Sequence, residues 1–427
     1  MTRNKSILSS LLVAVAMVVT AFTALAADPT ATRYSFGECD GSLRPYPAPA
    51  QYVLPDTLTP VFINHVGRHG SRYPAGSTFT MSLIEVLRQA EELKTITPLG
   101  RELLGICNAV VAEVNGQWGA LDSLGMAEQR AIAYRMYDRF KPLMAGARIS
   151  AMSSYSPRCI MSMYSFTHQL ARMNNNIEVY TNSGRQNSLL MRPFDVEQDY
   201  IDFRESRAWE PPYKEYQEKA LPLSALRRVL GNDFPLDNID ARKVALDEYY
   251  VIAGMAAMSM PVDQKRFFTL EEYNALWGAF NLRQYLQRTA TTISTVPADI
   301  ASPLLLDLIT TTQNFIDGHG DVSVILRFGH AETLMPLLSL MHLPGCYYIT
   351  NYFDTVAMHW RDFDVVPMAA NLQLVLLRSP KGRYYLLTLL NEKPVTLIPG
   401  SDSTIVPWEQ AATYLNRCIP LYYQIAL

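Results

Sequence analysis

The stretch that decides the fold is "PVFINHVGRHGSRYP", residues 60–74. Its first half, residues 60–67, is an apolar run that is typical of a buried strand. Its second half places two arginines, a histidine and a glycine directly at the end of that strand. In parallel sheets ligands bind beyond the carboxyl ends of the strands. A cation-rich peptide at this position therefore predicts an anion site rather than an ordinary solvated loop.

Further β-type runs extend this strand into a sheet. Three of them predict strands at residues 147–156, 176–182 and 321–329. Helical patterns separate these runs from one another and from the first strand, which favours an α/β fold with a mainly parallel central sheet and flanking helices. Residues 371–379 and 383–392 predict an antiparallel hairpin at the end of the fold.

Long helical segments interrupt the α/β pattern. Roughly 140 residues of helical periodicity separate the third and fourth strands, far more than one crossover needs. Within them, Thr269 and Glu272 fit a capping box at the start of a helix. We expect an inserted helical subdomain. The bounds of the α/β core are placed at approximately residues 55–80, 145–200 and 318–427, with helical insertions at approximately 81–144 and 201–317.

The first 26 residues have the pattern of a secretory signal. Arg3 and Lys5 precede an apolar segment, and a small-x-small pattern ends at Ala26. We expect cleavage there, which leaves residues 27–427 as one mature domain that is secreted or periplasmic. The alternative is an uncleaved membrane anchor, because the apolar segment approaches the length that spans a bilayer.

Charge and cysteine content exclude several function classes. The chain has 37 basic and 40 acidic residues, and removing the leader takes away two basic residues and no acid, so the net charge changes from −3 to −5. A net negative charge does not favour binding to nucleic acid or to an anionic membrane. Any anionic ligand must therefore be held by local arginines. The five cysteines are scattered without C-x-x-C spacing. Cys346 and Cys418 could form a disulfide.

Two other strand ends carry polar residues. Arg158 follows the second predicted strand, although a lone arginine could equally form a surface ion pair. Where the fourth strand becomes a helix, the chain presents a histidine and a glutamate. Forked arginine donors can converge on a phosphate and leave a histidine between them as a nucleophile. The predicted phosphoryl-transfer site comprises Arg68, His69, Arg72, Arg158, His330 and Glu332.

These residues carry a family resemblance. "RHGSRYP" matches the RHGxRxP signature of the histidine phosphatase superfamily, and the helical insertion resembles its acid phosphatase and phytase branch. Most members of that branch have His-Asp at the second catalytic site. His330-Ala331-Glu332 instead looks like the HAE variant of the multiple inositol polyphosphate phosphatases. The stretches "FFTLEEYNALW", "VVPMAANLQLVL" and "LLNEKPV" also resemble that family, so the similarity covers most of the mature chain.

The resemblance implies a mechanism. His69 would attack phosphorus and form a phosphohistidine, and Glu332 would protonate the leaving alkoxide and then activate water. The residues implied to hold the non-bridging oxygens are Arg68, Arg72, Arg158 and His330. Because arginines supply the cations, no metal and no cofactor is implied. The implied substrates are inositol polyphosphates, including the hexakisphosphate. The alternatives are a general exported acid phosphatase acting on small monoesters and, less favoured, a phosphomutase.

Four other residues have two interpretations each. Arg185 and Arg192 follow the third strand and could meet peripheral substrate phosphates or form surface ion pairs. His65 alternates with its neighbours on the first strand, which favours an interior or supporting histidine with its hydrogen bonds satisfied over a catalytic one. His319 lies between aspartates and glycines, and the pattern favours a turn over a metal site.

Overall fold

The computed structural model describes residues 33–47, 49 and 52–425. The chain divides into two compact units, Met1–Ser35 and Phe36–Leu427. Only residues 33–35 of the first unit are described, so the predicted leader lies outside the described residues. All features below belong to the second unit.

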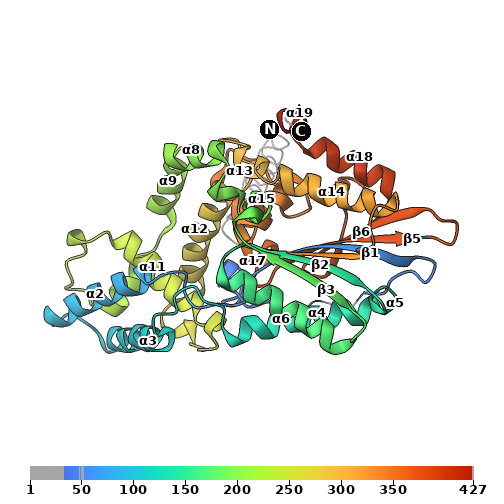
Figure 1. The fold of residues 1–427 in the computed structure, drawn as a ribbon. Coiled ribbons are helices and arrows are strands. Elements are labelled where there is room, and N and C mark those ends of the chain that lie inside the picture. The colour runs from blue at the N-terminus through green and yellow to red at the C-terminus, as the bar shows by residue number, and fades with distance from the viewer. Residues whose placement is uncertain (1–32, 48, 50–51, 426–427) are drawn as a thin grey trace, which may run out of the picture. The chain divides into compact units, whose positions relative to one another are not determined.

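One sheet forms the centre of this unit (Figure 1). Its strands are β1 (Thr59–Arg68), β2 (Arg148–Ser153), β3 (Glu178–Ser183), β4 (Val324–Gly329), β5 (Asn371–Arg378), β6 (Tyr384–Leu390), β7 (Lys393–Val395) and β8 (Ile405–Pro407). The order across the sheet is β3-β2-β4-β1-β5-β6-β7, and β8 pairs with β6.

The four strands predicted to be parallel are parallel. β1 pairs with β4, β4 with β2, and β2 with β3. Arg68 is in register with Gly329, and Ser153 with Phe328, so these three strands end at the same edge. The predicted hairpin is β5–β6, which joins the sheet through an antiparallel pairing of β5 with β1. β1 is buried over most of its length, as its nearly continuous apolar sequence requires.

Helices cover both faces of the sheet (Figure 1). Alternate residues of β5 belong to two different hydrophobic clusters, one on each face. The first cluster is covered by α14 (Ser302–Ile316), α15 (Ala331–Leu340) and α18 (Trp408–Cys418). The second is covered by α4 (Ser123–Arg139), α5 (Lys141–Met144) and α6 (Pro157–Met173).

Seven further helices form a group beside the sheet, at the edge where β1, β2 and β4 end (Figure 1). They are α2 (Thr78–Glu92), α3 (Pro98–Val114), α8 (Gln198–Ser206), α9 (Glu210–Ala220), α10 (Ser224–Leu230), α11 (Ala241–Gly254) and α12 (Leu270–Arg288). α2 packs against α11, and α3 against α10, so both predicted insertions contribute to one helical subdomain. However, α4 and α14 fall within the sequence ranges of those insertions and pack on the sheet. The insertion bounds remain predictions.

Short helices connect these layers. They are α7 (Ser188–Met191), α13 (Val296–Asp299), α16 (Val356–His359), α17 (Asp362–Val365) and α19 (Leu421–Ile425). No helix among the described residues is long and apolar enough to cross a membrane. All five cysteines are free thiols, so the disulfide considered for Cys346 and Cys418 is not formed.

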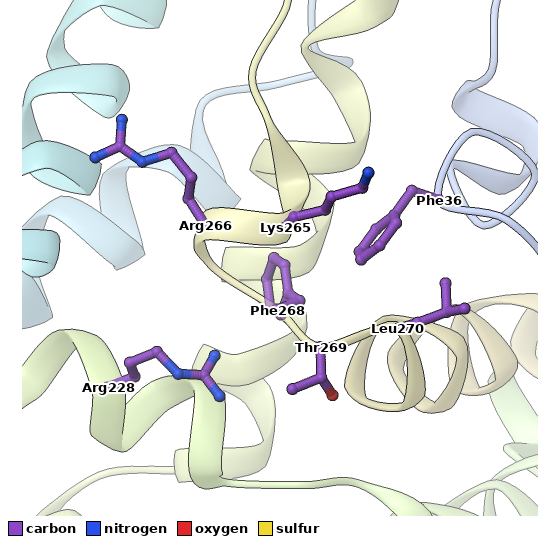
Figure 2. Close-up of a pocket in the computed structure, with 7 residues that line it drawn as sticks. All are labelled: Phe36, Arg228, Lys265, Arg266, Phe268, Thr269 and Leu270. Atoms are coloured by element: carbon purple, nitrogen blue, oxygen red, sulfur yellow. The ribbon is translucent and has the colours of Figure 1, made fainter.

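A cavity of about 430 Å³ lies beside the first turn of α12 (Figure 2). It is lined by Phe36, Arg228, Lys265, Arg266, Phe268, Thr269 and Leu270. Arg228 forms an ion pair with Glu272, and Arg266 with Glu102, so carboxylates already neutralise both arginines. Glu272 also completes the predicted capping box with Thr269. This end of α12 is thus fixed by its own ion pair and cap.

Candidate active site

The peptide after β1 turns sharply across the end of the sheet. The backbone N–H of His69 donates to the carbonyl of Gly329 at 3.0 Å, which ties the ends of β1 and β4 together. A Cβ atom at Gly70 would lie 2.4 Å from the carbonyl oxygen of Gly125 in α4, so only glycine fits there. The close approach of α4 explains the glycine in the "RHGSR" sequence.

α4 holds this peptide from behind. The Glu128 carboxylate accepts hydrogen bonds from the backbone N–H of Ser71 at 2.7 Å and from its hydroxyl at 2.8 Å. Gln129 Nε2 donates to the carbonyl of Arg68 at 2.9 Å. Burial raises the pKa of Glu128, although the N–H groups that it binds oppose this effect. Sequence reasoning missed both supporting residues, because no motif marks them and only the fold brings α4 to the strand end.

His69 is buried and has a defined tautomer. Its Nδ1 lies 2.9 Å from the carbonyl oxygen of Gly70, which can only accept, so Nδ1 carries the hydrogen and Nε2 keeps its lone pair. Burial, followed by the positive charges of Arg158 and Arg68, lowers the pKa of His69 well below its usual value. The imidazole is therefore neutral, and Nε2 has the electronic form that a nucleophile requires.

Three arginines that form no ion pair with a described residue surround His69. Arg68 donates from Nη1 to two backbone carbonyls at 2.6 Å, and Arg72 donates to the carbonyl of Tyr73 at 2.8 Å. The Nε atoms of Arg68, Arg72 and Arg158 are buried without a hydrogen-bond partner. Burial and the nearby Arg72 lower the pKa of Arg68 to about 10. Over residues 33–47, 49 and 52–425, no carboxylate forms an ion pair with these three arginines, so the site is built for an external anion.

His330 shows where such an anion would bind. Its Nε2 lies 2.7 Å from Nη1 of Arg192 and 3.0 Å from the hydroxyl of Ser154. A guanidinium only donates, so Nε2 is the acceptor and Nδ1 of the neutral ring carries the hydrogen. Nδ1 then faces a second donor, Nη2 of Arg158, at 3.3 Å. Burial, followed by Arg158, lowers the pKa of His330, which keeps the ring neutral. An anionic oxygen between these two donors would satisfy both.

Glu332 lies in the first turn of α15. Its Oε1 accepts a hydrogen bond from Nη2 of Arg288 at 3.1 Å. Burial raises the pKa of Glu332, but the positive charge of Arg288, supported by Arg68, outweighs that effect and holds the pKa well below its usual range. The rings of His69 and His330 are 5.7 Å apart between centroids. The structure thus brings together the residues predicted for the site, and their catalytic roles remain predictions.

The two peripheral candidates differ. Arg192 binds His330, stacks over the rings of Tyr155 and Phe194, and forms an ion pair with Asp195 at 2.6 Å. It is therefore part of the central site and not of the periphery. Arg185 is exposed and stacks on Tyr155, with 4.8 Å between its guanidinium carbon and the ring centroid. Arg185 stays a predicted contact for a peripheral substrate group.

The two remaining histidines lie outside the reaction centre. His65 is buried against Phe166 and Phe328, and burial lowers its pKa to about 3, so its interior position is as predicted but the hydrogen bonds expected of a satisfied histidine are missing among the described residues. Neither of its ring nitrogens has a hydrogen-bond partner in the described part of the chain. His319 lies between Gly318 and Gly320, whose φ angles of 76° and 102° mark the predicted turn.

Comparison with known proteins gives consistent matches. The model of the histidine phosphatase superfamily (branch 2) matches residues 61–391. Multiple inositol polyphosphate phosphatase 1 of Gallus gallus is 27% identical over 406 residues, covering 87% of this chain and 84% of that protein. The Homo sapiens protein of the same name is 25% identical over 386 residues, covering 82% and 78%.

Solved structures share the fold. The Bifidobacterium longum multiple inositol polyphosphate phosphatase in complex with inositol hexasulfate has a TM-score of 0.74 at 17% identity, covering 88% of this chain and 97% of that chain. The phytase from D. castellii has a TM-score of 0.66 at 15% identity, covering 93% and 89%. The family match spans well over half of the sequence and includes both strand ends that carry the histidines. The chain therefore belongs to the histidine phosphatase superfamily, branch 2.

Proposed function

We propose that the protein is an exported phosphomonoesterase that hydrolyses inositol polyphosphates, including inositol hexakisphosphate, through a covalent phosphohistidine. The observation that carries the proposal is the unneutralised set of donors around His69. Among the described residues, Arg68, Arg72 and Arg158 form no ion pair, and the N–H group of His330 points at Arg158. A phosphoryl group, with three charged oxygens around one phosphorus, matches this arrangement.

Relatives support the choice of substrate. Proteins named multiple inositol polyphosphate phosphatase cover most of this chain, and one solved relative holds inositol hexasulfate. A substrate with several anionic groups around one ring also suits the cations beyond the centre, such as exposed Arg185. We infer that one phosphate occupies the donors around His69 while its neighbours meet these outer cations.

The proposed reaction has two balanced steps. His69 Nε2 forms a bond to phosphorus as the bond to the leaving oxygen breaks, and that oxygen takes the proton of Glu332. Water then attacks the phosphohistidine, gives its proton to Glu332 and releases inorganic phosphate. Nδ1–H stays on the carbonyl of Gly70 throughout, which stabilises the imidazole as it becomes positively charged. Overall, one ester and one water yield one alcohol and one phosphate.

Substrate preference is the decisive experiment. Purified protein would be assayed for kcat/KM with inositol hexakisphosphate and with a small alkyl monoester. We expect a clear preference for the inositol compound. Equal values would favour a general acid phosphatase, and transfer of phosphate to an added sugar alcohol in place of water would favour a phosphomutase. No release of phosphate from either compound would refute the phosphatase assignment.

Export is tested separately. The proposal rests on the sequence pattern that ends at Ala26. N-terminal sequencing of the protein recovered from periplasm or medium should begin immediately after that residue. A chain that stays in the membrane fraction with its first residues intact would show an anchor instead.

A further inference from the structure

Arg288 reaches the catalytic edge from the helical subdomain. It is the last residue of α12, the helix that starts at the cavity of Figure 2. Its Nη2 binds Glu332, and its Nη1 donates to the side-chain oxygen of Gln287 at 3.2 Å. Its Nε is buried without a partner. The N–H group at Nε of this guanidinium thus has no acceptor among the described residues, while Nη2 binds Glu332, the proposed proton donor.

Among the described residues, three arginines are the charged groups around Glu332. The groups that face it are Arg288 from α12, His330 at the start of α15, Arg68 at the end of β1, Arg158 and Cys159 from α6, and Tyr200 from α8. Its nearest cation is Arg288, the one to which it is directly hydrogen bonded. In the free protein these cations keep the Glu332 carboxyl ionised.

An ionised carboxylate cannot protonate a leaving alkoxide. The geometry that holds Glu332 in the free protein therefore conflicts with the role it has in the proposed reaction. The conflict disappears if a bound anion competes for Arg288. The Glu332 side chain is 34% exposed and that of Arg288 is 18% exposed, so a substrate group can reach both.

We propose that Arg288 exchanges partners, holding Glu332 as a carboxylate in the free protein and turning to a substrate anion on binding, so that Glu332 takes up the proton it later delivers. This inference rests on the proposed function. It makes Arg288 a positioning residue, because it acts on the leaving group through Glu332. The proton comes from solvent or from a phosphate monoanion, whose remaining acidic proton has a pKa of about 6. It passes from Glu332 to the leaving oxygen, and attacking water replaces it.

Proton uptake on binding tests the exchange without catalysis. Inositol hexasulfate serves as the probe, because sulfate esters remain fully ionised and contribute no protons of their own. Calorimetry in two buffers with different ionisation enthalpies, near pH 4, gives the number of protons that the protein takes up. This pH is close to the ordinary glutamate pKa of about 4.3. His69 and His330 can also gain protons, so Glu332→Gln serves as the baseline.

We expect the native protein to take up roughly half a proton or more beyond the Glu332→Gln baseline, because its Glu332 is fully ionised before binding. In Arg288→Gln, Glu332 is already partly protonated before binding, so the proton uptake that comes from Glu332 should fall to about half its native value. Hexasulfate should also bind this variant about tenfold more weakly. Arg288→Lys keeps the charge and should recover native uptake. Double variants with Glu332→Gln isolate the glutamate's share in each background.

Arg228→Gln is the matched control. Arg228 also forms an ion pair with a glutamate of α12, at 2.8 Å, but at the opposite end of the helix. It should keep native proton uptake even if its melting temperature falls. If Arg288→Gln lost its fold, the native protein compared with Glu332→Gln would still test whether Glu332 takes up a proton on binding.

Three results would overturn the exchange. They are equal uptake by the native protein and Glu332→Gln, an unchanged glutamate share in Arg288→Gln, and no hexasulfate binding to the native protein at all. Phosphate release from inositol hexakisphosphate is measured in parallel. A protein that hydrolyses the substrate but fails the proton test refutes only the exchange, whereas one without hydrolysis refutes the proposed function.

Discussion

The edge of the parallel strands and the helical subdomain contribute to the site in different ways. At the strand edge, His69 and His330 are fixed by backbone hydrogen bonds and by neighbouring strands. In the subdomain, Arg288 reaches the site only because α12 ends there. The strand edge thus supplies a preformed anion site, whereas the subdomain supplies a group whose partner can change. The difference suggests that the reaction centre is rigid and that its proton donor is adjustable.

The two ends of α12 sharpen this comparison. Arg228 binds Glu272 at 2.8 Å, and the same glutamate caps the helix, so the pair serves the helix itself. Arg288 binds Glu332 of a different element at 3.1 Å, two positions after His330. Both are arginine–glutamate pairs, but only the second can exchange its partner for a substrate. The role of an arginine–glutamate ion pair therefore depends on the groups around it and not on the type of contact alone.

The largest effect is expected at the strand edge. His69→Ala removes the proposed nucleophile from among the three arginines, so turnover should fall on the order of 10⁴-fold or more. The fold should survive, because a small residue at a strand end costs little packing. Activity and a melting curve are measured together. Turnover close to native would mean that another group attacks phosphorus, or that none does.

Glu332→Gln tests the adjustable part of the site. It keeps size and hydrogen bonding but has no proton to give, so hydrolysis of alkyl phosphates should slow about 10²- to 10⁴-fold. Release of nitrophenol from an aryl phosphate should slow much less in the first turnover, because a nitrophenolate leaves without a proton. The pre-steady-state burst separates this step from hydrolysis of the intermediate. Equal slowing for both leaving groups would exclude Glu332 as the general acid.

The strand edge was predictable from sequence, and the reason is local. Five residues of the "RHGSR" peptide carry an arginine pair, the nucleophile and the glycine in one turn, and the polar residues after β4 lie within three positions of each other. Parallel strands then bring these peptides together. Arg158 was ambiguous as a lone residue, and Arg192 was placed too far from the centre, because its position depends on the short turns after β3.

The supporting groups were not predictable in this way. Glu128 and Gln129 act from the middle of a helix that was assigned to an insertion, although its apolar face covers the sheet. Arg288 precedes Glu332 by 44 positions and belongs to a helix of the helical subdomain. Such pairs depend on the angle and end point of whole helices, which hydrophobic periodicity does not specify. A capping box could be read for the start of α12, but no comparable signal marked its end.

A smaller loss of activity is expected when the contacts between α4 and the peptide after β1 are weakened. Glu128→Gln replaces a carboxylate that binds both the N–H and the hydroxyl of Ser71 with a weaker acceptor. The loop should loosen, and kcat should fall about tenfold, equivalent to roughly 1.4 kcal/mol. Gln129→Glu is the matched comparison, because it removes the donor to Arg68. An unchanged kcat in both variants would show that α4 does not position the loop.

Arg228→Gln should affect stability but not chemistry. The pKa of Glu272 lies below its ordinary value, because Ser224, the capping N–H and Arg228 together outweigh burial. A depressed folded pKa gives stability above the unfolded pKa of about 4.3, which is lost as the pH falls through the folded value. The melting temperature should therefore drop by a degree or two at about pH 7 and by less at about pH 3. A clear loss of kcat in Arg228→Gln would erase the distinction between the two ends of α12.

The smallest effect, none at all, is expected from chelation. The transferred phosphoryl group would already face Arg68, Arg72 and Arg158, and a divalent cation would have to enter among these three positive charges. Repulsion at such short range opposes binding there, and the arginines supply the charge that a metal would otherwise bring to the equatorial oxygens. EDTA should thus leave the rate with nitrophenyl phosphate unchanged. The small substrate is chosen because inositol hexakisphosphate itself binds metals, which would confuse enzyme inhibition with substrate release. Loss of activity in EDTA, restored by one divalent ion, would show that the three arginines do not neutralise the phosphoryl group alone.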